Sequence, residues 1–210
     1  MNLPASPIVA ATNRRLSASH TLLLATGFSG MLFILVFVIL GWLAPGYNSL
    51  CQTISALEFT TLSFAQRANF FVFGLLLCCF AAALRREITP GRGAFLIPLF
   101  QVFAGIAFIG DAVFIYEPLH TICDLIAFNS SMMVLFLFAW RFLREPAWKG
   151  WTAYSIITAI AMMAFLAAFG FANHLGGPAG LFEKLATCTR TIWSALLAAR
   201  LLSGRRLGPV

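Results

Sequence analysis

Two stripes of polar residues are the part of this chain whose side chains can do chemistry. The first stripe consists of His120, Asp124, Ala127 and Ser131, and the second of Glu183, Thr187, Arg190 and Ser194. Within each stripe, spacings of three and four residues place the side chains on one face of a helix. Ionisable groups in apolar helices usually face the interior of a bundle or a wet cavity. We therefore predict that the two stripes meet in one polar site.

A third carboxylate, Asp111, is expected to join them, because only a tight turn at residues 117–118 separates its segment from the first stripe. If the stripes face each other, Arg190 comes within reach of Asp124, and pairing removes much of the cost of desolvating either charge. Two carboxylates at matched depth in a low-dielectric setting cannot both stay charged without a partner. They would share a proton, pair with Arg190 or His120, or bind a cation.

Three interpretations of this cluster stay open: a structural clamp between helices, a site for a ligand or for protons, and a metal site. In the metal interpretation the ion is zinc and the candidate ligands are Asp111, His120, Asp124 and His174. His20 stands at the opposite end of an apolar segment, and no HExxH pair supports a catalytic zinc. We therefore predict no cofactor and keep zinc as the alternative.

Catalytic signatures are missing from the sequence. It contains no GxSxG nucleophile motif, no phosphate-binding loop GxxxxGK[ST] and no dinucleotide-binding GxGxxG. No catalytic residue is assigned, and binding is favoured over catalysis.

The polar stripes belong to apolar stretches that are long enough to cross a bilayer. Six such stretches run over residues 20–44, 66–84, 94–116, 119–142, 150–172 and 181–202. A helix rising about 1.5 Å per residue needs about 20 apolar residues to span a hydrocarbon core of about 30 Å. With 60% hydrophobic and 10% charged residues, so short a chain cannot build a soluble surface. The sequence predicts an all-α membrane protein, a bundle of six transmembrane helices.

Basic residues predict how this bundle is oriented. Most Lys and Arg residues crowd at every second end of the spans, and such loops are retained in the cytoplasm. Both termini are therefore predicted to be cytoplasmic, and the net charge of +7 reflects topology and lipid contact rather than nucleic-acid binding. The predicted parts are a disordered cytoplasmic tail (1–19), the transmembrane domain (20–203) and a second tail (204–210). A bacterial inner membrane is the expected location.

The longest outer connection, residues 45–65, is predicted to be an interfacial segment. Ser49 and Gln52 have the spacing of a capping box, and an amphipathic run follows that can form a short helix over the outer end of the bundle. With this segment included, the predicted binding residues are Asp111, His120, Asp124, Glu183, Arg190, Thr187, Ser131, Asn48, Ser55 and Glu58.

Five cysteines are present, an odd number. Cys51, Cys123 and Cys188 map to the outer half, where a disulfide such as Cys51 with Cys123 is one alternative. Cys78 and Cys79 lie within a span, where cysteine serves as a small packing residue.

Three blocks of residues resemble a known family. They are Pro45-Gly46-Tyr47-Asn48 with Ile54-Ser55-Ala56-Leu57, Gly110-Asp111 with Leu119-His120, and Gly180-Leu181-Phe182-Glu183-Lys184 with Trp193 and Arg200. Together they resemble the six-helix membrane proteins of the DUF998 family, a domain of unknown function. Family members commonly have ISxLG where this chain has Glu58 in place of the glycine. The resemblance implies a fold and a topology but no established reaction.

Three functions remain as hypotheses. The first is binding of a small amphiphile, or proton handling, in the outer polar site; the second is a metal-dependent hydrolase acting on membrane lipids. The third is a structural partner of other membrane proteins, or a homo-oligomer, that packs through small-residue faces. Candidate faces contain Ala104 and Ala107, or Ala195 and Ala199.

Overall fold

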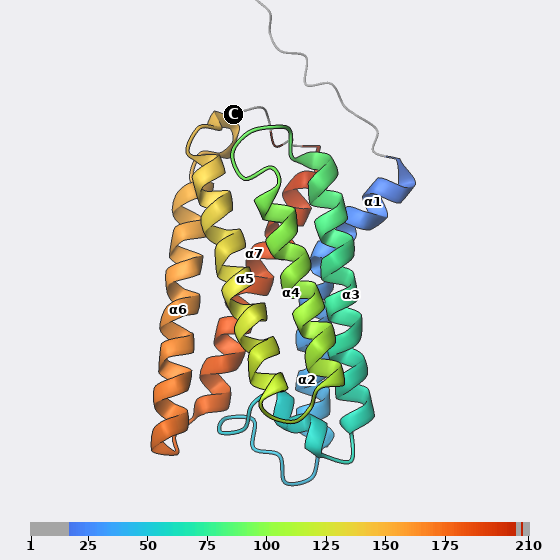
Figure 1. The fold of residues 1–210 in the computed structure, drawn as a ribbon, viewed down its shortest axis with the longest axis vertical. Coiled ribbons are helices and arrows are strands. Elements are labelled where there is room, and N and C mark those ends of the chain that lie inside the picture. Colours follow the sequence, from blue (N-terminus) through green and yellow to red (C-terminus); the bar gives the residue numbers. More distant parts are fainter. Residues whose placement is uncertain (1–16, 205–206, 208–210) are drawn as a thin grey trace, which may run out of the picture.

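The computed structural model describes residues 17–204 and Leu207, and these residues form helices and loops without a β-strand. The helices are α1 (Ala18–Ala25), α2 (Ser29–Leu43), α3 (Ser63–Glu87), α4 (Leu96–Val113), α5 (Leu119–Phe142), α6 (Trp151–Leu175) and α7 (Ala179–Leu202). Short 3-10 turns are η1 (Thr26–Phe28), η2 (Ser55–Phe59) and η3 (Pro146–Trp148). Figure 1 shows long helices running side by side, with α1 at the upper end.

Every predicted span overlaps one of these helices over most of its length, and the first span corresponds to α1 and α2 joined by η1. The ends differ by a few residues. Helix α4 stops at Val113 because Phe114 leaves the helical conformation (φ −101°, ψ 79°), which turns its carbonyl towards His120. Helix α6 lies between two glycines with positive φ, Gly150 (88°) and Gly176 (69°), a conformation that favours glycine.

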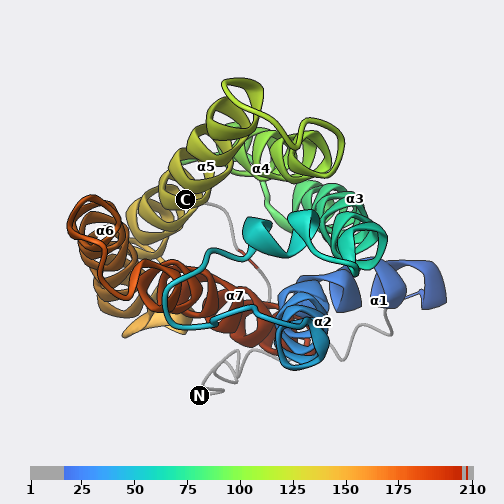
Figure 2. The same ribbon diagram turned by 90° about the horizontal axis from the view of Figure 1, so that it is seen from below.

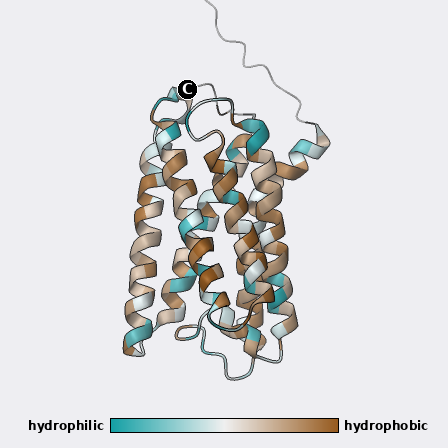
Figure 3. Ribbon diagram, in the orientation of Figure 1, coloured by the Kyte–Doolittle hydropathy of each residue, from teal (hydrophilic) through white to brown (hydrophobic). Residues whose placement is uncertain are grey.

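Length and composition support a multi-pass membrane protein. Five helical segments are long and apolar enough to cross a bilayer: Ala18–Leu43, Ser63–Glu87, Leu96–Val113, Leu119–Phe142 and Trp151–Leu175. Helix α7 is also 24 residues long but carries more polar side chains, many of them buried. Figure 3 shows apolar residues along most of the helices and polar ones near the ends and at a few internal positions.

The six long helices form a ring in which each packs on the next and α7 closes against α2 (Figure 2). Two apolar clusters fill it. The upper one includes Phe138 and Trp193, with ring centroids 5.2 Å apart. The lower one includes Phe33 stacked on Phe73 at 4.5 Å, and Phe108 beside them. A packed interior therefore separates the two ends of the bundle.

Small residues serve this packing. A Cβ on Gly74 of α3 would lie 2.4 Å from the carbonyl oxygen of Gly105 on α4, so only glycine lets these helices approach so closely. Ala104, Ala107 and Ala195 are buried in the bundle as well. The faces proposed from the sequence for a partner are therefore largely used within the chain.

The predicted tails fall mostly on residues outside the described part. Within it, Ser17 caps α1 by accepting a hydrogen bond from the N–H of His20, so the helix begins before residue 20. Leu207 is fully buried and pairs with Ile88 just beyond α3. Since His20 contacts Glu87 at the end of α3, Ser17 and Leu207 lie at the same end of the bundle. Which side of the membrane that end faces stays a prediction.

Candidate functional site

Polar residues gather where α4 turns into α5, and this turn lies at the lower end of the bundle in Figure 1. Asp111 lies in the last turn of α4, His120 in the first turn of α5, and Asp124 one turn further on. One ligand atom from each, a carboxylate oxygen or an imidazole nitrogen, lies within 4.8 Å of the other two. The structure therefore brings together three of the predicted site residues.

Two more carboxylates lie close enough to influence Asp111 electrostatically, Glu58 from η2 and Glu183 from α7. We call Glu58, Asp111, His120, Asp124 and Glu183 the acidic cluster. Asp111 is 0% exposed and Glu58 2% exposed. Within the described residues, neither carboxylate has a hydrogen-bond partner on either oxygen. Burying a charged group without a partner is costly, so these carboxylates favour the binding of a cation or of protons.

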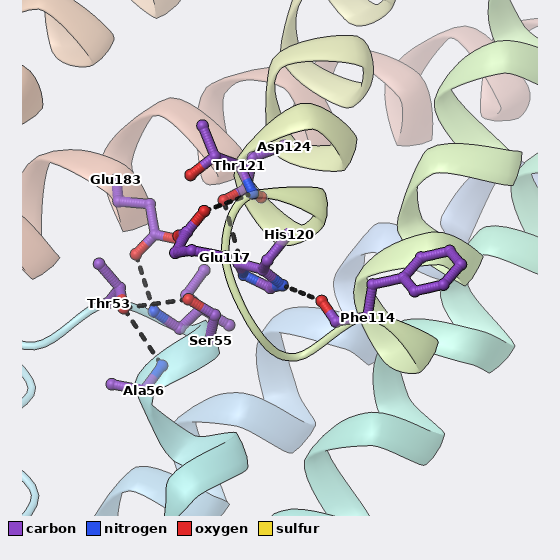
Figure 4. Close-up of polar contacts among 10 residues, drawn as sticks. Thr53, Ser55, Ala56, Phe114, Glu117, His120, Thr121, Asp124 and Glu183 are labelled. Carbon is purple, nitrogen blue, oxygen red and sulfur yellow. Dashed lines mark hydrogen bonds and ion pairs between the residues drawn. The ribbon is translucent and has the colours of Figure 1, made fainter.

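His120 is held by a backbone carbonyl. Its Nδ1 lies 3.0 Å from the carbonyl oxygen of Phe114, which can only accept a hydrogen bond, so Nδ1 carries a proton. The other ring nitrogen, Nε2, is buried without a hydrogen-bond partner among the described residues and lies 3.7 Å from Oδ2 of Asp124. Figure 4 shows the imidazole between these two groups. In the neutral ring, Nε2 therefore presents a lone pair to a carboxylate.

Residues 45–62, which we call the strap, cross the lower end of the ring (Figure 2). The strap is bound to the start of α7. The carboxylate of Glu183 accepts a hydrogen bond from the N–H of Ile54 at 2.7 Å, and Lys184 donates to the carbonyls of Ser49 (3.0 Å) and Gln52 (2.8 Å). A Cβ on Gly180 would lie 1.9 Å from the carbonyl oxygen of Gln52, so glycine is required here.

The strap differs in detail from the predicted amphipathic helix. The capping residue is Asn48 rather than Ser49: its Oδ1 accepts from the N–H of Leu50 at 3.0 Å, and Oε1 of Gln52 accepts from the N–H of Asn48 at 2.6 Å. Ser55 shares a hydrogen bond with Thr53 at 3.1 Å (Figure 4). Asn48 and Ser55 therefore shape the strap, whereas Glu58 reaches the cluster.

The pKa values of ionisable groups in the loops are shifted by burial, hydrogen bonds and neighbouring charges. Burial raises the pKa of Glu58 to about 7; Arg67 opposes this shift and the charge of Asp124 adds to it. A hydrogen bond with Thr121 lowers the pKa of the exposed Glu117. Burial, with a smaller contribution from Glu183, raises the pKa of Tyr47. Of the loop carboxyl groups, Glu58 is thus the one whose pKa is raised by burial within the cluster.

Arg190 is not part of the cluster, so the predicted pairing with Asp124 is wrong. Its guanidinium donates to Oε1 of Gln101 on α4 at 2.8 Å and to the hydroxyl of Ser194, and it lies 5.2 Å from the ring centroid of Trp193. Gln101 was not among the predicted site residues, although an amide in the middle of an apolar span is itself a signal of an interhelical contact.

The other polar residues of the two stripes also lie deeper. Ser131, Thr187 and Arg190 line a separate cavity between the helices. The hydroxyl of Thr187 donates to the carbonyl of Glu183, one turn back, at 3.0 Å. The stripes therefore serve two places, with their outer members at the acidic cluster and their inner members at this cavity.

Two further predictions can be compared with the structure. His174 is exposed at the end of α6 and does not belong to the group that can hold a metal, and His20 contacts Glu87 at the opposite end of the bundle. Cys51 and Cys123 are free thiols, as are the other three cysteines, so the disulfide alternative is wrong.

Comparison with known proteins identifies a family for this chain. A family model described as "Protein of unknown function (DUF998)" matches residues 28–200, which include all of the acidic cluster and the strap. No curated protein and no solved structure matches the chain.

Proposed function

Since the chain belongs to the DUF998 family, whose description names no activity, we propose a function from its own side chains. The protein is a multi-pass membrane protein that binds a divalent metal ion at the lower end of its bundle. The ligands are Asp111, His120 and Asp124. In the membrane this end faces away from the cytoplasm, as the distribution of basic residues predicts.

The contact between His120 and Asp124 carries this proposal. Because Nδ1 of His120 is bound to a carbonyl, Nε2 offers a lone pair, and the carboxylate 3.7 Å away offers only lone pairs as well. Two such acceptors repel each other unless a proton or a metal ion lies between them. Asp111 adds a third acceptor within 4.8 Å, fully buried and without a partner among the described residues.

The donor set indicates the kind of metal. Imidazole suits zinc and other transition ions, whereas carboxylates suit harder ions such as manganese. One imidazole with two carboxylates therefore favours Zn²⁺ or Mn²⁺. Metal–ligand distances of about 2.0–2.2 Å require these side chains to move slightly closer together on binding. The carbonyl of Phe114 fixes the orientation of the imidazole, as outer partners of metal-binding histidines usually do.

A metal-dependent lipid hydrolase is the second candidate function, and Glu58 favours it. Its buried carboxylate lies near Asp111 and Asp124 and has no partner among the described residues. A carboxylate in this position can accept a proton from a water molecule bound at the site. The location at one end of a membrane bundle suits a lipid substrate.

Binding of an amphiphile or of protons would satisfy the same lone pairs. Because Arg190 lies elsewhere, the cluster is acidic, so an amphiphile bound here would need a cationic head group such as an amine. An anionic head group does not suit it.

Metal titration tests the proposal. Protein purified in detergent and treated with EDTA should bind one Zn²⁺ or Mn²⁺ by calorimetry. Asp111→Asn and His120→Ala should each weaken binding by about a hundredfold or more, as expected for loss of one ligand. Glu117→Gln, which removes an exposed carboxylate outside the group, should bind like the wild type.

Absence of stoichiometric binding, or an Asp111→Asn variant that binds like the wild type, would overturn the metal site. An amine amphiphile found by mass spectrometry in the metal-free protein would support the alternative ligand.

Labelling of Cys51 tests the orientation. This thiol is exposed at the lower end of the bundle, whereas the other four are partly buried. A membrane-impermeant maleimide should label Cys51 on intact cells and should not label a Cys51→Ser variant. Labelling only after the membrane is broken would place the lower end in the cytoplasm.

A further inference from the structure

Arg190 is a buried cation that the proposed metal site does not use. It lies in α7 and is 7% exposed. Within the described residues, which include all seven acidic residues of the chain, no carboxylate forms an ion pair with it. Glu183 lies seven residues earlier, about 10 Å along the helix axis, and binds the strap instead.

The guanidinium of Arg190 cannot become neutral by losing its proton, because arginine stays charged in proteins. Its contacts to Gln101, Ser194 and Trp193 supply dipoles and a ring face but no negative charge. An uncompensated charge among transmembrane helices is expensive. The charge balance therefore calls for an anion.

The space beside Arg190 has the size and chemistry to hold a small anion. Its side chain lines a partly open cavity of about 20 Å³ between the helices, together with the hydroxyl-bearing residues Ser29, Ser131 and Ser194. Nε of Arg190 and the hydroxyl of Ser29 are buried without partners among the described residues. The hydroxyl of Ser194 accepts from Arg190, which leaves its own proton to donate. Several donors thus converge on one cavity that contains no carboxylate.

We propose that this cavity binds a single monatomic anion, chloride in the cell, held by the guanidinium of Arg190 and the hydroxyls of Ser29, Ser131 and Ser194. A volume of about 20 Å³ accommodates about one water molecule or an ion of similar size. Apart from Thr187 and Thr191, the remaining walls carry no polar side chain and include Phe73, which strengthens the attraction between the charges. This site shares no residue with the acidic cluster.

Anion-dependent stability tests the proposal on EDTA-treated protein, so that the outcome does not depend on the metal site. At constant ionic strength, the melting temperature in detergent should rise saturably with chloride or bromide and should not respond to gluconate. Bromide should give one anomalous diffraction peak beside Arg190. Ser29→Ala should weaken the apparent chloride affinity by about tenfold, the effect of losing one hydrogen bond to a charged group.

Arg190→Gln should abolish the chloride response while the protein still folds, because the charge that needs an anion is gone. Ser130→Ala is the matched control: Ser130 is as buried as Ser131, its neighbour on α5, but does not line the cavity. Equal stability in chloride and gluconate, a site occupied by water only, or a chloride response that persists in Arg190→Gln would overturn the proposal.

Discussion

The two ends of the bundle treat buried charge differently. At the upper end, Arg141 is fully buried and its guanidinium lies 2.9 Å from the carboxylate of Glu145. The same guanidinium donates to the carbonyl of Arg92 at 3.0 Å and to the hydroxyl of Thr89 at 3.1 Å. At the lower end, Asp111 is equally buried and has no hydrogen-bond partner among the described residues.

This difference separates the structural clamp from the two binding interpretations that the sequence leaves open. The upper end shows that the bundle can pair a buried charge when the purpose is to hold helices and loops together. His20 and Glu87, which join α1 to α3 at that end, are a second example. A structural clamp therefore describes the upper end well. The lower end gathers several carboxylates around one imidazole, and those of Asp111 and Glu58 have no hydrogen-bond partner among the described residues, which favours a ligand site.

Disruption of the buried ion pair at the upper end should have the largest effect on stability. Arg141→Gln breaks the buried ion pair with Glu145, and removal of one partner of a buried pair costs about 3–5 kcal/mol. The free energy of unfolding, measured by denaturant titration in mixed micelles, should fall by that amount. Metal binding at the lower end should be unchanged.

The matching change at the lower end is Asp111→Asn in EDTA-treated protein. Because this carboxylate has no hydrogen-bond partner to lose among the described residues, stability should stay the same or rise. A loss as large as that of Arg141→Gln would show that both ends are structural, and the comparison between them would fail.

A smaller effect is expected from Glu58, and it should depend on pH. Its pKa is raised from 4.5 to about 7, so the folded state holds the proton more tightly than the unfolded state. Stability from this group is therefore complete below about pH 4.5 and is lost as the pH rises through about 7. In EDTA-treated protein, Glu58→Gln should gain about 2 kcal/mol over the wild type between about pH 5 and pH 7. Thermal unfolding at several pH values measures this difference, and a constant difference would contradict it.

The membrane helices could be predicted from the sequence because length and apolar composition suffice for them. Residues 119–142 form α5 with the predicted bounds, since the span begins after Pro118 and stays apolar to its end. The neighbourhood of Asp111, His120 and Asp124 also followed from spacing, because one short turn joins their helices.

The partners of Arg190 and Glu183 could not be predicted in the same way. Helical spacing gives the face of a side chain but not the depth at which a neighbouring helix offers a partner. Arg190 therefore meets Gln101 rather than Asp124, and Glu183 binds the backbone of the strap at Ile54. Contacts of this kind depend on how loops and helices pack in three dimensions.

The smallest expected effect concerns how the strap covers the lower end. Lys184 donates to the carbonyls of Ser49 and Gln52, which lie at the surface, so Lys184→Met should cost only about 1 kcal/mol. The loss should be local, and hydrogen exchange should quicken across residues 48–62 while the helices stay protected. Lys149→Met, at an exposed position of the upper end, is the control and should leave the exchange of the strap unchanged. If the strap exchanges equally in both variants, its attachment to α7 depends on Glu183 and the backbone of Gly180 and Leu181, whose hydrogen bonds to the strap remain in either variant.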